Sequence, residues 1–335
     1  MTKAMNETNE MNALLSAVQT AGSILLFSHI SPDGDTLGSA LALKIRLERL
    51  GKRVAWALDG EVPKNLSFLP TVQCVQKPIA LSETACEYDL AISVDVSCEE
   101  RMGECLPLFL AAKQQAVIDH HGTNPGFGNY LLIDAEAPAT AVLIHRIFER
   151  MSMPLQREEA VCLYTALATD TGNFIYESTN SESFHMMGNL MDTGFALSEY
   201  SRLLFRQKRL EFVKLLGKVL STLRVTCDGA VAGLTLTMED LKQAGASHGD
   251  TDCIVDYAID IEGVKLAYFA KETEDGRVKV SLRALAPYRI DEVASRVGGG
   301  GHRLAAGCTV DVPLAEAALA MEAALKTELD RGKAV

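Results

Sequence analysis

The sequence predicts an α/β protein in which a doubly wound, mainly parallel sheet domain is followed by a helical linker and a smaller α+β C-terminal domain. Three observations support this. Buried apolar runs alternate with helical patterns in the first half, which is typical of parallel sheets covered on both faces. The second half changes to strands joined by a hairpin. The length of 335 residues also exceeds that of most single cores, so we expect two domains with a cleft between them.

The strands of the first domain are expected at five apolar runs. These are ILLFS (24–28), VAWALD (54–59), DLAISVDVS (89–97), QAVIDHH (115–121) and NYLLID (129–134). An amphipathic helix is expected over 36–50, ending at Gly51, and further helices over 138–151 and 158–170. This βα alternation predicts the parallel sheet.

The second half of the chain has a different pattern of apolar and polar residues. Residues 185–220 are expected to be mostly helical, whereas VAGLTLT (231–237), KLAYFAKE (265–272) and RVKVSLRA (277–284) are typical of strands. The segment TEDGR (273–277) predicts a hairpin turn between the last two. We therefore expect a catalytic domain over 1–187, a helical linker over 188–222 and a substrate-binding domain over 223–335.

Composition limits the kind of protein and its partners. Hydrophobic residues make up 48% of the chain and charged residues 23%, and no apolar run approaches the roughly 20 residues that span a membrane. The eight cysteines are scattered, without a C-x-x-C pair, and the N-terminus lacks a signal-peptide pattern, so we expect the cytoplasm. The net charge of −12 argues against binding to long duplex nucleic acid. The oligomeric state is left open, a homodimer included.

Residue types that bind metals follow the predicted strands at their carboxyl ends. Doubly wound sheets bind ligands in the crevice beyond these ends. Taken singly, each candidate has an ordinary explanation; Asp35 or Thr36, for example, fits a helix cap. Together they favour a metal site. The candidates are His29, Asp33 and Asp35 in SHISPDGDTLGS, Asp95 in VDVS, Asp119, His120 and His121 in VIDHHGTN, and Asp170 in ATDTGNF.

Carboxylates that share a crevice repel one another unless a cation or shifted pKa values relieve the repulsion. The four negative charges of this set would be neutralised by two divalent ions, the usual arrangement for phosphoryl transfer to water. Imidazole among the carboxylates favours manganese, iron or zinc over magnesium. The four carboxylates are those of Asp33, Asp35, Asp95 and Asp170.

These residues, in this order, resemble the DHH phosphoesterase family, named for the triplet that stands here as Asp119-His120-His121. The four segments quoted above match its motifs. The segment GGGGHRLAAG (298–307) resembles the glycine-rich motif of the DHH-associated C-terminal domain. Among family members, the compact length is most similar to NrnA-type oligoribonucleases that also act as pAp phosphatases.

The resemblance implies a role for each matching residue. Asp95 would bridge two manganese ions, Asp119 would orient a histidine, and His121 would contact the scissile phosphate or assist the leaving oxygen. These three are the expected catalytic residues. The ligands of the first ion would be His29, Asp33, Asp95 and Asp170, and those of the second Asp35, Asp95 and His120.

The glycine-rich segment lies in a basic part of the chain. Residues 277–303 include six basic and two acidic side chains. Successive glycines let backbone N–H groups approach an anion, and Arg283 can bind a phosphate bidentately. A dinucleotide fingerprint is excluded because its spacing would need glycine at position 303. The resemblance assigns substrate binding to this segment, and the candidate residues are Ser281, Arg283, Gly299, Gly300, Gly301, His302 and Arg303.

The expected function is that of a manganese-dependent phosphoesterase. It would hydrolyse short oligoribonucleotides to mononucleotides and remove the 3′-phosphate of pAp, by in-line attack of metal-activated water. A phosphodiesterase for linear or cyclic dinucleotides (pApA, c-di-AMP) remains an alternative. A pyrophosphatase-like enzyme is disfavoured by the C-terminal segment. A catalytically silent nucleotide-binding regulator fits less well, because such decay normally removes a ligand.

Overall fold

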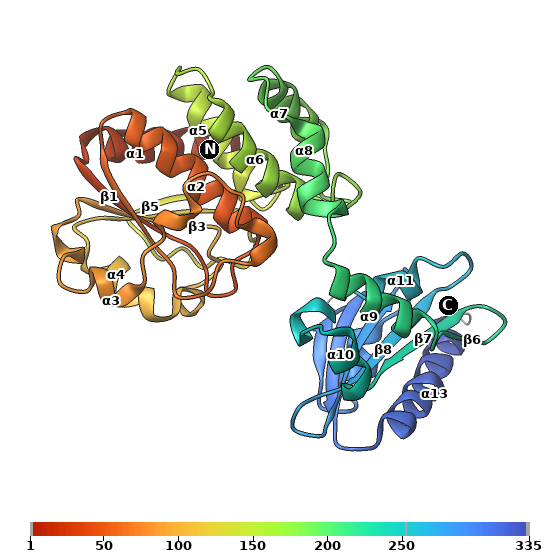
Figure 1. Ribbon diagram of the computed structural model, residues 1–335. Coiled ribbons are helices and arrows are strands. Elements are labelled where there is room, and N and C mark those ends of the chain that lie inside the picture. Colours follow the sequence, from red (N-terminus) through yellow and green to blue (C-terminus); the bar gives the residue numbers. More distant parts are fainter. Residues whose placement is uncertain (1–2, 252, 333–335) are drawn as a thin grey trace. The chain divides into compact units, whose positions relative to one another are not determined.

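Five parallel strands form the sheet of the N-terminal unit in this computed structural model, which describes residues 3–251 and 253–332 (Figure 1). The spatial order is β2-β1-β3-β4-β5, which places the switch point of the doubly wound sheet between β1 and β3. The predicted parallel sheet is confirmed. The strands are β1 (Ser23–Phe27), β2 (Arg53–Ala57), β3 (Leu90–Val94), β4 (Gln115–Asp119) and β5 (Tyr130–Ile133).

Helices cover both faces of this sheet. On one face, α1 (Lys3–Thr20), α2 (Gly34–Arg49), α5 (Thr140–Arg150) and α6 (Arg157–Asp170) pack against alternate strand residues such as Ile24 and Leu26. On the other face, α3 (Pro78–Leu81) and α4 (Leu106–Ala111) pack against Leu25 and Phe27. The same unit includes α7 (Ser181–Met191), α8 (Leu197–Ser201), a π-helical turn (Arg202–Arg206) and the short 3-10 segments Lys64–Leu66, Val72–Cys74, Ala85–Glu87 and Glu99–Cys105.

Two glycines allow α2 to pack closely against α6. A Cβ atom on Gly34 would lie 2.8 Å from Cβ of Thr169, and one on Gly38 would lie 2.9 Å from Cβ of Ala166. Both distances are shorter than a van der Waals contact, so a larger residue at either position would force the helices apart. This packing matters because α2 carries Asp35 and α6 ends at Asp170.

A fully buried ion pair also joins these two helices. Arg46 donates to both carboxylate oxygens of Glu159, at 2.8 and 2.9 Å, and to the carbonyl of Met153. Arg49 adds a third hydrogen bond to Glu159 at 2.7 Å. These bonds lower the pKa of Glu159 although its burial acts in the opposite direction. The pair is therefore ionised and fixes the α2–α6 arrangement.

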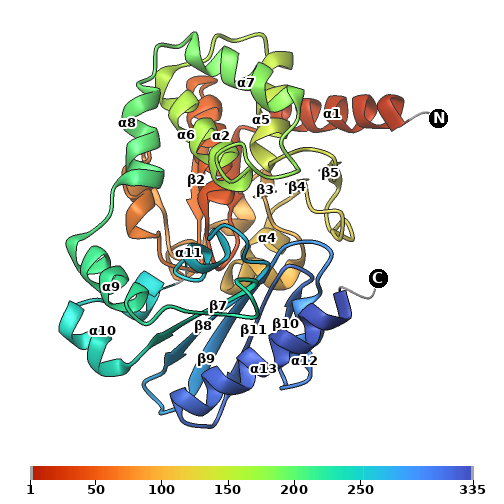
Figure 2. The same cartoon turned by 90° about the vertical axis from the view of Figure 1, so that its right-hand side faces the viewer.

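The C-terminal unit has a six-stranded mixed sheet, and its strands and helices are labelled in Figures 1 and 2. The spatial order is β10-β11-β9-β8-β7-β6, and all neighbours are antiparallel except β7 and β8. The strands are β6 (Arg224–Thr226), β7 (Val231–Leu236), β8 (Leu266–Glu272), β9 (Val278–Ala284), β10 (Gly300–His302) and β11 (Ala305–Val310).

Two sets of helices pack on this second sheet. One core contains α12 (Ile290–Ser295) and α13 (Leu314–Gly332), whose apolar side chains contact alternate residues of β8, β9 and β11. The other core contains α9 (Leu210–Leu220), α10 (Met238–Ala244) and α11 (Asp256–Ile259), which contact β7 and β8. A 3-10 segment spans His248–Thr251. The unit is thus an α+β domain.

The chain divides into two units at residues 207 and 208, namely Met1–Gln207 and Lys208–Val335. The segment expected as a helical linker over 188–222 is shared between them. Residues up to the π-helical turn pack on the N-terminal core through Leu190 and Leu204. Helix α9 instead buries Phe212 and Leu215 in the C-terminal core, because its apolar face matches the sheet there.

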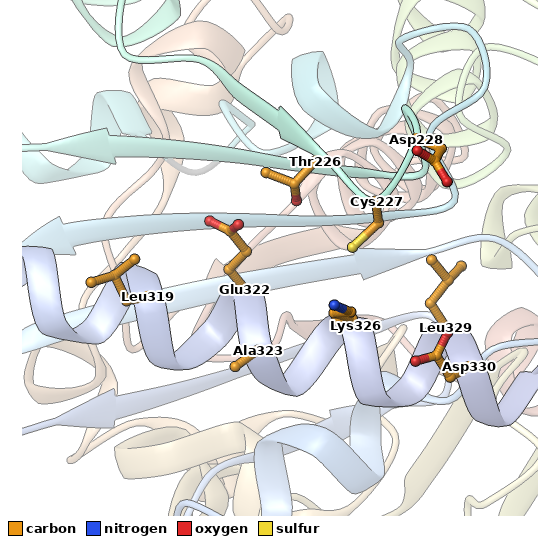
Figure 3. A pocket seen from close by; sticks show the side chains of 9 residues that line it. All are labelled: Thr226, Cys227, Asp228, Leu319, Glu322, Ala323, Lys326, Leu329 and Asp330. Carbon is orange, nitrogen blue, oxygen red and sulfur yellow. The ribbon is translucent and has the colours of Figure 1, made fainter.

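The C-terminal unit also has a surface cavity of about 530 Å³ between α13 and the turn that follows β6 (Figure 3). Its lining includes Glu322, Lys326 and Asp330 on the helix and Asp228 on the turn, and Glu322 lies next to Thr226. None of the residues predicted to bind substrate lines this cavity. Among the described residues, no helix has the length and apolarity needed to cross a membrane.

Candidate metal centre and active site

The loop after β1 places a histidine and two aspartates at the carboxyl edge of the first sheet. His29 is buried, at 3% exposure. Asp33 is the residue that caps α2, since its side chain accepts hydrogen bonds from the backbone N–H groups of Asp35 at 3.0 Å and Thr36 at 3.1 Å. The capping role that the sequence left open for Asp35 or Thr36 is thus taken by Asp33, and the carboxylate of Asp35 is free for another contact.

Asp35 points into the protein and binds the start of a different helix. Its carboxylate accepts hydrogen bonds from the backbone N–H groups of Thr140 at 2.6 Å and Ala141 at 3.1 Å, and from the hydroxyl of Ser39 at 2.8 Å. Helix α5 has no side-chain cap of its own at Ala139. Asp35 therefore satisfies backbone donors at the N-terminus of α5 and is held rigidly at 1% exposure.

Asp95 follows β3 in an unusual backbone conformation. Its φ angle is 61°, a left-handed value that is uncommon for residues other than glycine, asparagine and aspartate. The backbone N–H of Asp95 donates to the carbonyl of Ile118 at 2.9 Å, and its carboxylate accepts from the hydroxyl of Thr140 at 3.0 Å. These bonds hold the Asp95 side chain at 2% exposure in the centre of the site.

His120 presents one ring nitrogen to three carboxylates. Its Nδ1 donates to the carbonyl of Ala137 at 3.2 Å, which directs Nε2 toward the site. The distance from Nε2 is 3.3 Å to Asp170, 3.7 Å to Asp95 and 3.8 Å to Asp35. Asp170 reaches this cluster from the C-terminal end of α6, whereas the other residues follow strands or begin α2.

The potential ligands fall into overlapping groups whose donor atoms lie within 4.8 Å of one another. In one group, His29 Nε2 lies 3.6 Å from both the Asp33 and the Asp95 carboxylates. The resemblance assigns Asp170 to the first ion, and in the structure its carboxylate lies 3.3 Å from His120 Nε2. The groups are His29–Asp33–Asp95, Asp35–His120–Asp170 and Asp95–His120–His121.

The crowding of carboxylates shifts several pKa values. Burial, followed by the charges of Asp95 and Asp170, raises the pKa of Asp35 well above its usual range. Burial also raises the pKa of Asp170 to about 6, although His120 opposes this. Burial lowers the pKa of His29, but the carboxylates beside it prevail and raise it to about 9. The site thus has an excess of negative charge that a cation would relieve.

Asp119 orients His121 behind this cluster. His121 Nδ1 donates to Asp119 Oδ1 at 2.8 Å, which raises the pKa of His121 and leaves its Nε2 available. Asn124 holds the other carboxylate oxygen, because its side-chain amide donates to Asp119 Oδ2 at 2.7 Å and to the carbonyl of Val96 at 2.9 Å. Burial opposes the effect of these bonds, but the pKa of Asp119 is nevertheless lowered.

Sequence reasoning missed Thr140, which donates to both Asp35 and Asp95, and two further residues that the structure places beside the ligands. Asn124 is one, and its position in the segment HHGTN was the available signal. Arg101 is the other: its Nη2 atom lies 3.1 Å from Nδ1 of His29, and it brings a positive charge to the site. Arg101 comes from the 3-10 segment after β3, for which the sequence pattern gave no indication.

The donor set fits divalent cations. Each of the first two groups combines one imidazole with two carboxylates, a mixture that suits manganese, iron or zinc. Asp35 is fully buried with two other carboxylates nearby, which is costly without a neutralising charge. The hydrogen bonds of His120 to Ala137 and of Asp35 to α5 orient these side chains as metal ligands are usually oriented.

The predicted substrate-binding residues lie together in the C-terminal unit. In the sheet register, Arg283 of β9 is opposite Ala305 and Ser281 is opposite Gly307, both on β11. Arg283 donates to Asp256 of α11 at 2.9 Å and its side chain is 31% exposed. His302, on the edge strand β10, is exposed. Strand alternation directs Ser281 and Arg283 away from the core that contains α12 and α13.

Part of the glycine run has a packing role. Gly301 has a φ angle of 145°, and a Cβ atom there would lie 2.6 Å from the carbonyl oxygen of Ala305. A Cβ on Gly299 would lie 2.8 Å from Cα of Cys308. Gly300, in contrast, has open space around its Cα. Arg303 donates to the carbonyl of Pro287 at 2.9 Å and remains exposed. The run therefore forms the β10 edge strand, close against β11.

Comparisons with known proteins agree with this arrangement. The N-terminal domain of the DHH family matches residues 23–167, and the DHHA1 domain matches residues 228–327. The chain is 33% identical over 299 residues to the bifunctional oligoribonuclease and PAP phosphatase NrnA of Thermus thermophilus, covering 89% of this chain and 86% of that protein. It is 24% identical to the cyclic-di-AMP phosphodiesterase PdeA of Listeria monocytogenes, covering 91% of this chain and 47% of that protein.

A solved structure extends the similarity to almost the whole chain. The exopolyphosphatase-related protein from Bacteroides fragilis superposes with a TM-score of 0.86 at 27% identity, covering 96% of each chain. The fold, the site and the relatives define a hydrolase that acts on phosphate ester bonds. The chain belongs to the DHH family.

Proposed function

We propose that this protein hydrolyses short oligoribonucleotides to mononucleotides and removes the 3′-phosphate of pAp. The reaction would use two divalent ions, and manganese is the ion we expect. The observation that carries the proposal is the pair of ligand groups His29–Asp33–Asp95 and Asp35–His120–Asp170, together with the 33% identity to an oligoribonuclease and PAP phosphatase. When bound, the ions would lower the pKa of water and offset the negative charge of the phosphate.

The protein side chains supply the remaining parts of the reaction. Asp95 lies close to both groups, 3.6 Å from His29 Nε2 and 3.7 Å from His120 Nε2, and is assigned as the shared ligand. His121 is held by Asp119 so that its Nε2 can contact the phosphate or give a proton to the leaving oxygen. In the C-terminal unit, Arg283 and His302 are assigned to bind a substrate phosphate.

The substrate range of this proposal is restricted. The net charge of −12 disfavours long duplexes, and we expect short RNA, pAp and dinucleotides as partners. The scattered cysteines make the cytoplasm the expected compartment. A second candidate function is the hydrolysis of linear or cyclic dinucleotides, which is favoured by the match to a cyclic-di-AMP phosphodiesterase.

One substrate panel tests both candidates. Purified protein with manganese is given pAp, pApA, oligoribonucleotides of graded length, c-di-AMP and inorganic pyrophosphate, and kcat/KM is measured for each. Higher kcat/KM on short RNA and pAp than on c-di-AMP supports the first candidate, and the reverse order supports the second. If only pyrophosphate is hydrolysed, both fail. Samples treated with a chelator provide the metal-free control.

A further inference from the structure

A strained loop follows directly after Asp170. Three consecutive residues have left-handed backbone conformations, with φ angles of 56° at Gly172, 58° at Asn173 and 67° at Phe174. This conformation is unfavourable for residues with a side chain, and phenylalanine is among the residues that rarely adopt it. Such strain persists only where the surrounding structure enforces it, and it is concentrated at functional sites.

Hydrogen bonds hold this loop against the end of α6. The backbone N–H groups of Ile175 and Tyr176 both donate to the carbonyl of Thr171 at 3.0 Å, and that of Asn173 donates to Ala168 at 2.6 Å. The buried hydroxyl of Thr171 donates to Leu167 and accepts from the N–H of Phe174. The loop is therefore a defined turn that projects the side chains after it in fixed directions.

The turn presents one aromatic ring to solvent next to the metal ligands. Tyr176 is 60% exposed, and its ring packs against Gly172 on one side. A Cβ atom added to Gly172 would lie only 2.7 Å from Cε2 of the Tyr176 ring. Gly172 is two residues from Asp170, so their Cα atoms are at most about 7.6 Å apart. The hydroxyl of Tyr176 has no hydrogen-bond partner among the residues that the structure describes. Phe174 instead turns inward and packs against Phe184, with the two ring centroids 5.5 Å apart.

We propose that Tyr176 stacks on the nucleobase of the substrate nucleotide whose phosphate is bound at the metal centre. This inference rests on the proposed function, because it requires a nucleotide substrate. A ring supported on one side by a glycine backbone and open on the other can stack on any base, since every base has an aromatic face. Stacking also gives the N-terminal unit a contact with the base. Inorganic phosphate and pyrophosphate have no base and cannot make this contact.

The test compares Tyr176→Ala and Tyr176→Phe with the unaltered protein on pApA and on the same dinucleotide without its bases. Loss of one stacked base typically weakens binding roughly 5- to 150-fold. We expect KM for pApA to rise by that factor in Tyr176→Ala, with kcat changed less than about threefold, and Tyr176→Phe to stay near the original value. KM for the abasic substrate should be the same in all three proteins.

Phe184→Ala is the matched control, because it loosens the same loop without removing the Tyr176 ring. If this control raises KM as much as Tyr176→Ala does, or if Tyr176→Ala leaves KM for pApA unchanged, the stacking role is refuted. Quenching of 2-aminopurine in a fluorescent dinucleotide gives an independent signal and should disappear only in Tyr176→Ala. If the unaltered protein cleaves no nucleotide at all, the proposed function itself fails, and the stacking role fails with it.

Discussion

Replacing Asp95 by asparagine should abolish stabilisation by manganese while leaving the metal-free fold almost unchanged. Asparagine keeps an oxygen that can accept the bond from Thr140, and it tolerates the φ angle of 61° at this position. Only the charge is removed. The variant therefore separates the role of Asp95 as a ligand from its role in holding the loop after β3.

The effect on the metal-free protein can be worked from the distances. Protonated His29 lies 3.6 Å from Asp95, an attraction of about 4–5 kcal/mol at an effective dielectric constant of about 20. Asp33 lies within 4.8 Å of Asp95, a repulsion of about 3–4 kcal/mol on the same basis. The two nearly cancel, and the substitution also relieves the repulsion of Asp95 with Asp35 and Asp170, so the free energy of unfolding should change by no more than about 1 kcal/mol, or about 2–4 °C in Tm.

The effect with manganese should be larger. A ligand at about 100 times its Kd stabilises a protein by about 2.7 kcal/mol, which corresponds to roughly 5–11 °C for a unit of this size. We expect this rise in Tm in the unaltered protein and less than about 2 °C in Asp95→Asn. The assay is thermal unfolding of the full chain with and without manganese, and turnover of pAp is measured in parallel.

Asp192→Asn is the matched control, because Asp192 is exposed at the end of α7 and belongs to none of the ligand groups. It should keep both the manganese shift and the activity. Retention of more than half of the shift in Asp95→Asn would refute the assignment of Asp95 as a shared ligand. A fall of more than about 10 °C without metal would instead show that the charge of Asp95 is needed for folding.

Three further predictions concern the surroundings of the site. Gly38→Ala should lower stability by about 1–3 kcal/mol and weaken manganese binding, because the added methyl group separates α2 from α6, and thermal unfolding with manganese measures both. Glu159→Gln should cost about 3–5 kcal/mol in denaturant unfolding, because it leaves Arg46 buried without its counter-charge. Asn124→Ala should lower kcat about 10- to 100-fold with little change in Tm, because Asp119 loses one of the bonds that orient it.

Controls and contrary outcomes follow from the same contacts. Gly217→Ala, in α9, has open space around it and should be neutral or stabilising. Glu158→Gln, on the exposed side of α6, should change stability little.

The lowered pKa of Glu159 means that its contribution to the free energy of unfolding is present above its unfolded pKa and is lost as pH falls through its folded pKa. A Glu159→Gln variant as stable as the original at neutral pH would contradict this account, as would full activity in Asn124→Ala.

Much of the fold could be predicted because it depends on local sequence patterns. The apolar runs at 24–28, 89–97 and 115–121 became β1, β3 and β4, since a strand buried on both faces has few polar residues whatever surrounds it. The positions of His29, Asp95 and His120 after these strands followed directly. Helix α1 and strand β10 were missed, because the first has a polar N-terminal half and the second is a short run of glycines.

The candidate site could be predicted only in part. Parallel strands end at the same edge of a sheet, so the ligands that follow them could be expected to meet. Asp170 is different, because it ends a helix, and its place beside His120 depends on how closely α6 packs on α2 at Gly38. The bonds of Asp35 to the start of α5 join residues 105 positions apart and have no local signal.

The sequence by itself therefore determined which chemical groups the protein brings to its site, because motif residues and strand ends are local features of the sequence. Only the tertiary structure decided how these groups are arranged. It made Asp33 the helix cap, turned Asp35 inward, brought Asp170 to 3.3 Å from His120 and packed the Tyr176 ring against Gly172. Packing between helices and the hydrogen bonds of buried backbone groups fix these relations, and neither can be read from neighbouring residues in the chain.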